Sequence, residues 1–350
     1  MRFALLGNHP DGLAMAQALA AAGNPLVAVC DRSPPDFAAM ARSYSDLEDL
    51  LADPAVEAVV VAGPLGKRFE QLRRVIQSER AAYCVHPCDE KLDRAYEAAW
   101  MQSEAKHPLT PLLPDALHPA YARLAEILRE SGGVTLLKWE GGVGQTDAVA
   151  FRGWDVLRKI GGEIVEVSGF APTEEGNPAD PLLFHGKFEK GGLIQATLLP
   201  GTDAGQRINA IGPAETVELV GPDEGGAVRL LRVRRNGDMA EEKWDRWDRW
   251  AALVAQPERV TWQDAVRAME LDDALRRSVA KRKSSDLEYG DVSQDAAGKG
   301  TLTLIGCGMV WLIPVLLVMS IWVPQAGWAI IPMLLGFFVL VGLRWLGRKP

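Results

Sequence analysis

The chain has 350 residues, enough for two ordinary domains and a further segment, and its net charge of −8 argues against a nucleic-acid partner. Its four cysteines are too few and too irregularly spaced for a disulfide framework.

Short apolar strands alternate with helical patterns over the first 120 residues. The run 55–62 (AVEAVVVA) is apolar enough to be buried on both faces, which is typical of a strand in a parallel sheet. This rhythm predicts a Rossmann-type, doubly wound parallel sheet in residues 1–120. The predicted strands are 2–7, 26–31, 55–62 and 81–85, and the predicted helices are 12–22, 45–52, 67–78 and 90–104.

The pattern changes in residues 121–283, where one helix is followed by several strands that Gly-rich turns connect. Lys190-Gly191-Gly192 and Asn236-Gly237 are typical of hairpin turns. We therefore predict a second, α+β domain with an open-faced, mostly antiparallel sheet. Trp244, Trp247, Trp250 and Val254 are predicted to share one face of a helix that follows the strands. Packing in the core is favoured for this face over a platform for a ligand.

The C-terminal part contains a polar linker, 284–300, and then two uncharged apolar stretches, 302–323 and 326–343. A helix needs about 20 apolar residues to cross a bilayer, so residues 301–346 are predicted to form a two-helix transmembrane hairpin. Lys and Arg flank the hairpin on both sides, and such residues mark the cytoplasmic side. The expected location is the membrane, with the lipid bilayer as a partner and with the soluble domains and both termini cytoplasmic.

A candidate dinucleotide site lies where the first predicted strand meets the first helix. Gly7 and Gly12 match the first and third glycines of the G-x-G-x-x-G fingerprint, but His9 holds the middle position and crowds the approach of a diphosphate. Asp31 ends the second strand, where a carboxylate can bind the ribose hydroxyls of NAD and repel the extra phosphate of NADP. The predicted cofactor is NAD rather than NADP.

These features resemble the glucose–fructose oxidoreductase, inositol dehydrogenase and rhizopine catabolism (Gfo/Idh/MocA) family over about residues 1–283. The most characteristic segment is 44–64 (YSDLEDLLADPAVEAVVVAGP). The resemblance implies an NAD(P)-dependent oxidoreductase acting on a sugar, cyclitol or related polyol, and a possible homo-oligomer through the second sheet. It also implies that Arg32, Gly63, Pro64 and Pro87 belong to the cofactor-binding residues.

The positions that carry chemistry in the family differ here. Val85-His86-Pro87 stands where the family has Glu-Lys-Pro, whose lysine meets the reacting hydroxyl. Arg152 and Asp155 stand where the family has a histidine and an aspartate three residues apart. Arg152 cannot act as a base, because guanidinium stays protonated.

Two interpretations remain open. In the first, His86 is the base, Asp155 orients it or the substrate, and Arg152 binds an anionic group of the substrate. In the second, catalysis is lost and the fold serves as a nucleotide- or ligand-binding scaffold. A metal site at Cys84, His86 and Cys88 has suitable ligand types but poor geometry, so no metal is predicted.

Overall fold

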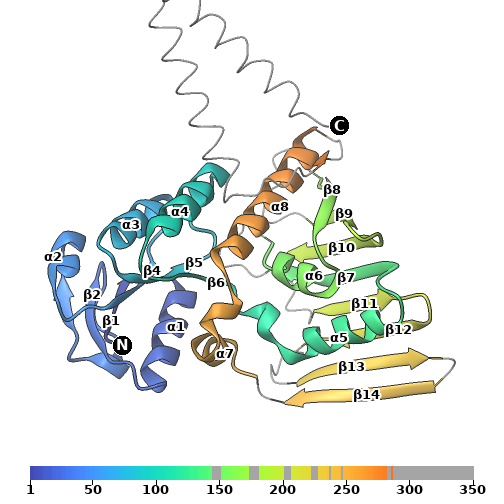
Figure 1. Ribbon diagram of the computed structural model, residues 1–350, viewed down its shortest axis with the longest axis horizontal. Coiled ribbons are helices and arrows are strands. Elements are labelled where there is room, and N and C mark those ends of the chain that lie inside the picture. Colours follow the sequence, from blue (N-terminus) through green and yellow to red (C-terminus); the bar gives the residue numbers. More distant parts are fainter. Residues whose placement is uncertain are drawn as a thin grey trace, which may run out of the picture. The chain divides into compact units, whose positions relative to one another are not determined.

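A computed structural model describes residues 1–143, 151–172, 181–200, 206–221, 228–235, 238–245, 247–281 and 285–286 (Figure 1). The described residues belong to one unit that extends from Met1 to Tyr289.

The first sheet is six-stranded and entirely parallel, in the order β3-β2-β1-β4-β5-β6. Every residue of β1 and β4 is buried, as expected for strands with helices on both faces. Its strands are β1 (Phe3–Gly7), β2 (Leu26–Cys30), β3 (Arg42–Tyr44), β4 (Ala58–Ala62), β5 (Ala81–Val85) and β6 (Leu109–Leu112). Its helices are α1 (Pro10–Ala21), η1 (Asp36–Ala38), α2 (Leu47–Ala52), α3 (Leu65–Gln77) and α4 (Leu92–Glu104).

The strand order reverses between β1 and β4, because β2 lies on one side of β1 and β4 on the other. In doubly wound sheets, ligands bind outside the carboxyl ends of the strands at such a reversal. The expected position of a dinucleotide is therefore at the carboxyl ends of β1, β2 and β4.

The second sheet has nine strands in the order β14-β13-β12-β11-β7-β10-β9-β8-β15, and only the pair β7–β10 is parallel. Burial alternates along β9, with Phe184 and Phe188 buried and Leu183 and His185 exposed, so one face is covered and the other is open. Its strands are β7 (Leu136–Val143), β8 (Ile164–Phe170), β9 (Leu182–Phe188), β10 (Leu193–Pro200), β11 (Arg207–Ile211), β12 (Glu215–Val220), β13 (Val228–Arg235), β14 (Asp238–Asp245) and β15 (Ser285–Asp286).

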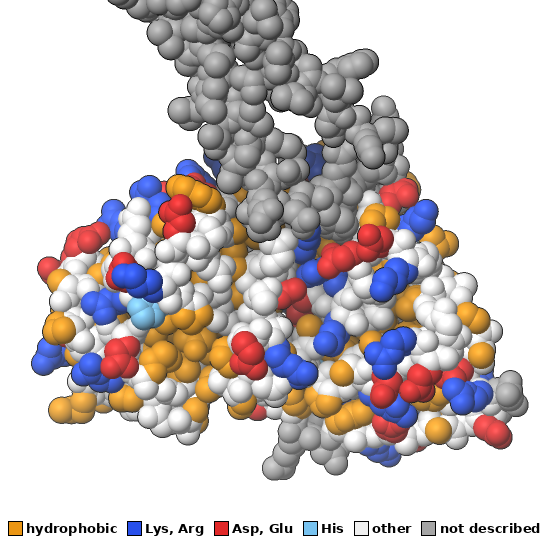
Figure 2. Space-filling model, viewed as in Figure 1, with side chains coloured by type: hydrophobic (Ala, Val, Ile, Leu, Met, Phe, Trp, Pro, Cys, Tyr) orange, Lys and Arg blue, Asp and Glu red, His pale blue; other side chains and the backbone are white. Residues whose placement is uncertain are grey.

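The remaining helices cover the second sheet or join it to the first. They are η2 (Asp115–Leu117), α5 (Pro119–Glu130), α6 (Trp154–Gly161), α7 (Arg249–Ala255), η3 (Pro257–Arg259) and α8 (Trp262–Lys281). Helices α5 and α6 pack on the second sheet, whereas α7 contacts α1 of the first domain (Figure 1). Across the second domain basic and acidic side chains are interspersed (Figure 2), as in the pairs of Arg232 with Glu218 and Glu241.

Helix α8 belongs to both hydrophobic cores. Its first half contributes Trp262, Val266 and Met269 to the core of the first domain. Its second half contributes Leu271 and Leu275 to the core of the second.

The parallel first sheet and the mostly antiparallel second sheet are confirmed, but some local predictions are wrong. The two edge strands of the first sheet, β3 and β6, were not predicted; both are short, and Pro111 is tolerated in β6 because it is an edge strand. The helix predicted from the tryptophan spacing begins later, at Arg249, so only Trp250 lies on it, and Trp244 belongs to β14.

The predicted membrane location, with a lipid bilayer as partner, is corrected. Among the residues that the structure describes, no helix is long and apolar enough to cross a membrane. The longest, α8, has 20 residues, but charged side chains recur in every turn of it. The transmembrane hairpin predicted at 301–346 lies outside the described residues.

Candidate functional site

The turn from β1 to α1 has the backbone that a Rossmann fingerprint requires. Gly7 has a φ of +90°, and a Cβ added there would lie 2.4 Å from the carbonyl oxygen of Ala62. A Cβ added at Gly12 would lie 2.2 Å from the Cβ of Ala62. Both glycines are needed because β1 and α1 pass close to the end of β4.

His9 caps helix α1 with its own side chain. Its Nδ1 accepts a hydrogen bond from the backbone N–H of Asp11 at 3.2 Å, and its backbone N–H donates to the carbonyl oxygen of Ala62 at 3.0 Å. The first N–H groups of a helix are the ones that bind an anion in this fold. The imidazole therefore engages a donor that a diphosphate would use.

Asp11, in the first turn of α1, is 7% exposed and supplies a negative charge at the helix N-terminus. Its Oδ2 lies 2.7 Å from Nη1 of Arg152, and its Oδ1 lies 3.8 Å from Nη2 of Arg249. Arg249 also pairs with Asp115, with Nη1 3.5 Å from Oδ1. A carboxylate is favourable at this end of a helix dipole. At the start of α1 the protein therefore supplies both an anion, Asp11, and its cationic partners, Arg152 and Arg249.

Asp31 follows β2 in a left-handed conformation, with a φ of +59°, and its Oδ2 accepts a hydrogen bond from Nε2 of Gln71 at 3.4 Å. Gln71 comes from α3, and a Cβ added at Gly63 would lie 1.9 Å from its Oε1. The side chain of Gln71 therefore fills the space over Gly63. Arg32 donates from Nε to the carbonyl oxygen of Ser33 at 3.0 Å.

Arg68 ties together the ends of β4 and β5. Its side chain is buried, and it donates from Nε to the carbonyl oxygen of Gly63 at 3.0 Å and from Nη1 to that of Pro87 at 2.5 Å. Pro64 is the N-cap residue of the same helix, α3. The carbonyl groups of Gly63 and Pro87 are thus bound to a buried guanidinium.

His86 ends β5, is joined to Pro87 by a cis peptide bond and is 5% exposed. Its Nε2 is buried and has no hydrogen-bond partner among the described residues. Burial lowers the pKa of His86 to about 3, and the positive charges of Arg152 and Arg68 add to the shift. His86 is therefore neutral at pH 7 and a weak base.

The cavity beside His86 is small. It has a volume of about 10 Å³, room for about one water, and Arg152, Arg249 and Trp250 help to line it. His86 and Arg152 thus lie at the same cavity.

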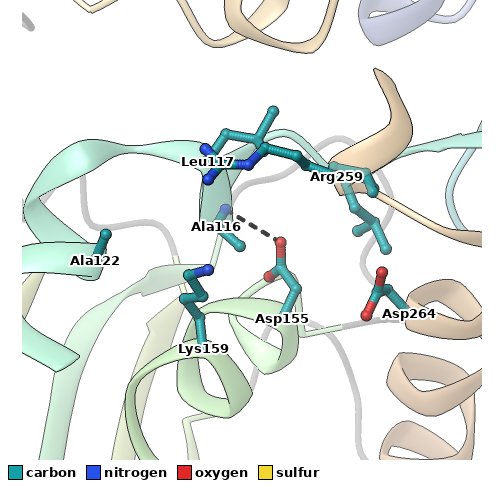
Figure 3. Close-up of a pocket in the computed structure, with 9 residues that line it drawn as sticks. Ala116, Leu117, Ala122, Asp155, Lys159, Arg259 and Asp264 are labelled. Carbon is teal, nitrogen blue, oxygen red and sulfur yellow. Dashed lines mark hydrogen bonds between the residues drawn. The ribbon is translucent and has the colours of Figure 1, made fainter. Parts of the chain in front are cut away.

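Asp155 lies at a different cavity, of about 210 Å³, that is bounded by η2, α5, α6 and η3 (Figure 3). Its Oδ2 accepts from the N–H of Ala116 at 3.3 Å. Burial raises the pKa of Asp155 to about 8, and the charge of Asp115 adds to this. Lys159, one helical turn after Asp155, and Arg259 also line this cavity and were not predicted as site residues, although the i, i+4 spacing places Lys159 on the same face of the helix.

The cysteines give no metal site in the described part of the chain. Cys84 and Cys88 are buried free thiols, and burial raises the pKa of Cys84 to about 12. Among the described residues no group of three His, Cys, Asp or Glu side chains is arranged to hold a metal ion.

Comparison with known proteins identifies the fold. No protein-family model matches the chain, and no curated protein sequence matches it. Solved structures do match it. An oxidoreductase from Agrobacterium radiobacter in complex with NAD+, L-tartaric acid and magnesium has a TM-score of 0.67 at 16% identity, over 82% of this chain and 98% of that one.

Two further structures match over similar lengths. The WlbA dehydrogenase from Bordetella pertussis, in complex with NADH and UDP-GlcNAcA, has a TM-score of 0.64 at 18% identity, over 83% of this chain and 99% of that one. The transcriptional regulator Gal80p from Kluyveromyces lactis has a TM-score of 0.64 at 15% identity, over 84% and 94%.

These matches establish that the described chain has the two-domain fold of NAD-binding oxidoreductases. The resemblance to the Gfo/Idh/MocA family is thereby confirmed at the level of the fold. One of these structures is a regulator, so the fold also occurs in proteins that are not named as enzymes.

Gly7, Gly12 and Asp31 are compatible with a bound dinucleotide, but the N-terminus of α1 is not. Asp11 and the imidazole of His9 occupy the end of α1 at which the fold binds the diphosphate.

Proposed function

We propose that this protein is a non-catalytic ligand-binding scaffold that retains the two-domain oxidoreductase fold. The observation that carries this proposal is the 2.7 Å ion pair between Arg152 and Asp11 at the start of α1. It joins the second domain to the helix end that binds the diphosphate in nucleotide-binding relatives of the fold.

Electrostatics supports weak coenzyme binding. A dinucleotide diphosphate is an anion, and a nearby carboxylate repels it, most strongly where burial limits screening by water. The Asp11 side chain is 9% exposed, so this repulsion is only partly screened. The Arg152 guanidinium is paired with Asp11, so the pair offers the diphosphate no net positive charge.

The groups near the expected hydride-transfer position also disfavour catalysis. Oxidation of an alcohol needs a base near the hydroxyl while hydride leaves to nicotinamide. A histidine whose pKa is lowered to about 3 holds a proton poorly at neutral pH. The cavity of about 10 Å³ beside His86 has no room for a sugar.

Calorimetric titration with NAD and with NADP tests the proposal. We expect binding weaker than about 1 mM for both, whereas a working coenzyme site typically binds in the micromolar range. Micromolar binding of NAD, followed by its reduction with a sugar, cyclitol or polyol, would refute the proposal.

The second candidate function is an NAD-dependent oxidoreductase acting on such a polyol. It is favoured by the intact frame of Gly7, Gly12 and Asp31, and by the coenzyme bound in two of the similar structures. If turnover is found, His86→Ala should abolish it. Unchanged turnover in that variant would remove His86 from the mechanism.

A further inference from the structure

The cavity next to Asp155 is lined by none of the residues of the β1–α1 turn and has about twenty times the volume of the cavity beside His86. Its walls come from η2 and α5, from α6, and from η3 with the start of α8. In Figure 3 the carboxyl group of Asp155 points up from α6, with the Lys159 amino group to one side and Asp264 to the other.

Two positive charges at this cavity have no acidic partner among the residues that the structure describes. Lys159 makes no hydrogen bond or ion pair with any described residue. Arg259 donates from Nη1 to the amide oxygen of Gln256 at 2.7 Å, which leaves its charge uncompensated. Both side chains are exposed, so the charged edge of the cavity is in contact with solvent.

The acidic groups of the cavity do not cancel these charges. Asp264 is engaged by the N–H and the hydroxyl of Thr261, both at 2.8 Å, and by Arg158 at 3.2 Å. Burial raises the pKa of Asp155 to about 8, which favours the neutral form of its carboxyl group at pH 7. The cavity therefore carries a net positive charge around a buried carboxylic acid.

A neutral carboxylic acid can donate one hydrogen bond from its hydroxyl group. An ionised oxygen is the strongest acceptor for such a donor. Asp155, Lys159 and Arg259 can consequently all bind the same kind of ligand group, an anionic oxygen.

The rest of the lining is apolar. Leu113, Leu117 and Val260, together with two alanines, line the cavity. A bare inorganic anion would leave these walls uncovered, whereas a short hydrocarbon chain would bury them.

We propose that this cavity binds a small aliphatic carboxylate, with its carboxylate at Lys159 and Arg259 and its chain against Leu117 and Val260. The site goes beyond the proposed scaffold function, because none of the residues that line it is among those assigned to cofactor binding.

Hexanoate is the probe, titrated into the full chain at pH 7 by calorimetry, with inorganic phosphate and hexanamide as comparison ligands. We expect saturable hexanoate binding, at least about tenfold tighter than that of either comparison ligand, since each lacks one of the two required features. Absence of hexanoate binding, or equal binding of phosphate, would overturn the assignment.

The variants Lys159→Ala and Arg259→Ala, on exposed positions, test the location without disturbing the core. We expect each to weaken hexanoate binding by about tenfold. The matched control Lys67→Ala, which removes an exposed lysine on α3, should bind as the unaltered protein does. Unchanged binding by both site variants would show that hexanoate binds elsewhere and would refute the proposal.

Discussion

The guanidinium of Arg152 lies 2.7 Å from the carboxylate of Asp11 and joins the second domain to the first helix of the first. A helix N-terminus can bind an anionic ligand, and here the carboxylate of Asp11 takes the place of such a ligand. Its consequences can be measured both as stability and as ligand binding.

Arg152→Ala should lower the free energy of unfolding by about 1–3 kcal/mol, because it leaves a largely buried carboxylate with more distant partners, Arg249 at 3.8 Å and His9 at 4.0 Å. Chemical denaturation measures this. The control Arg73→Ala removes one partner of an exposed pair with Glu70 and should cost less than about 1 kcal/mol. Equal losses in the two variants would indicate that the Arg152 pair is no more than a surface contact.

Asp11→Asn should strengthen NAD binding, by about tenfold or more, because it removes the repelling carboxylate and frees Arg152 and Arg249 beside the helix N-terminus. Calorimetric titration measures the change. The control Asp49→Asn removes an exposed acid from the first turn of α2 and should leave binding unchanged. If Asp11→Asn binds NAD no better than the unaltered protein, Asp11 is not what weakens the site.

Asp155 should make the protein less stable as the pH rises. Its pKa in the folded state, about 8, lies above its ordinary value of 3.8, so between these values the folded state binds more protons than the unfolded state. Stability is therefore full at low pH and falls as the pH rises towards 8, by at most about 1.4 kcal/mol per pH unit for one group.

Asp155→Asn removes that titration, so the decline in the thermal midpoint between pH 5 and 8 should be smaller in the variant. Asp272, whose pKa burial raises to about 7, retains its share of the decline in both proteins. Identical pH profiles for the variant and the unaltered protein would contradict the raised pKa of Asp155.

Two glycines of the first domain should respond to alanine in opposite ways. Gly12→Ala should destabilise the protein by about 1–3 kcal/mol, because the new methyl group would lie 2.2 Å from the Cβ of Ala62. Gly66→Ala, on α3, meets no atom within 4 Å and should stabilise it by up to about 1 kcal/mol. Thermal denaturation compares them, and a tolerated Gly12→Ala would mean that α1 can move away from β4.

Strong local patterns made much of the fold predictable from the sequence. The continuous apolar run of β4 and the glycine spacing after β1 each reflect a constraint that acts within a few residues. The edge strands β3 and β6 gave no such signal, since a short strand with one neighbour needs little apolar sequence.

The site was less predictable, because its contacts join residues that are distant in the sequence. Asp11 lies within the predicted fingerprint, but its partners Arg152 and Arg249 come from the second domain and from α7. Gln71 belongs to α3, which follows β4, and it reaches Asp31 after β2, two strands away in the sheet. The assignments of Gly7, His9, Gly12 and Asp31 to a cofactor stay predictions, as do those of His86, Arg152 and Asp155 to catalysis.

Helix α8 inserts apolar side chains into both cores, so neither half of the described unit can lose its packing without exposing part of the other. On heating, the two halves should accordingly unfold together in a single cooperative calorimetric transition. A hinge motion between them at α8 would require the helix itself to break.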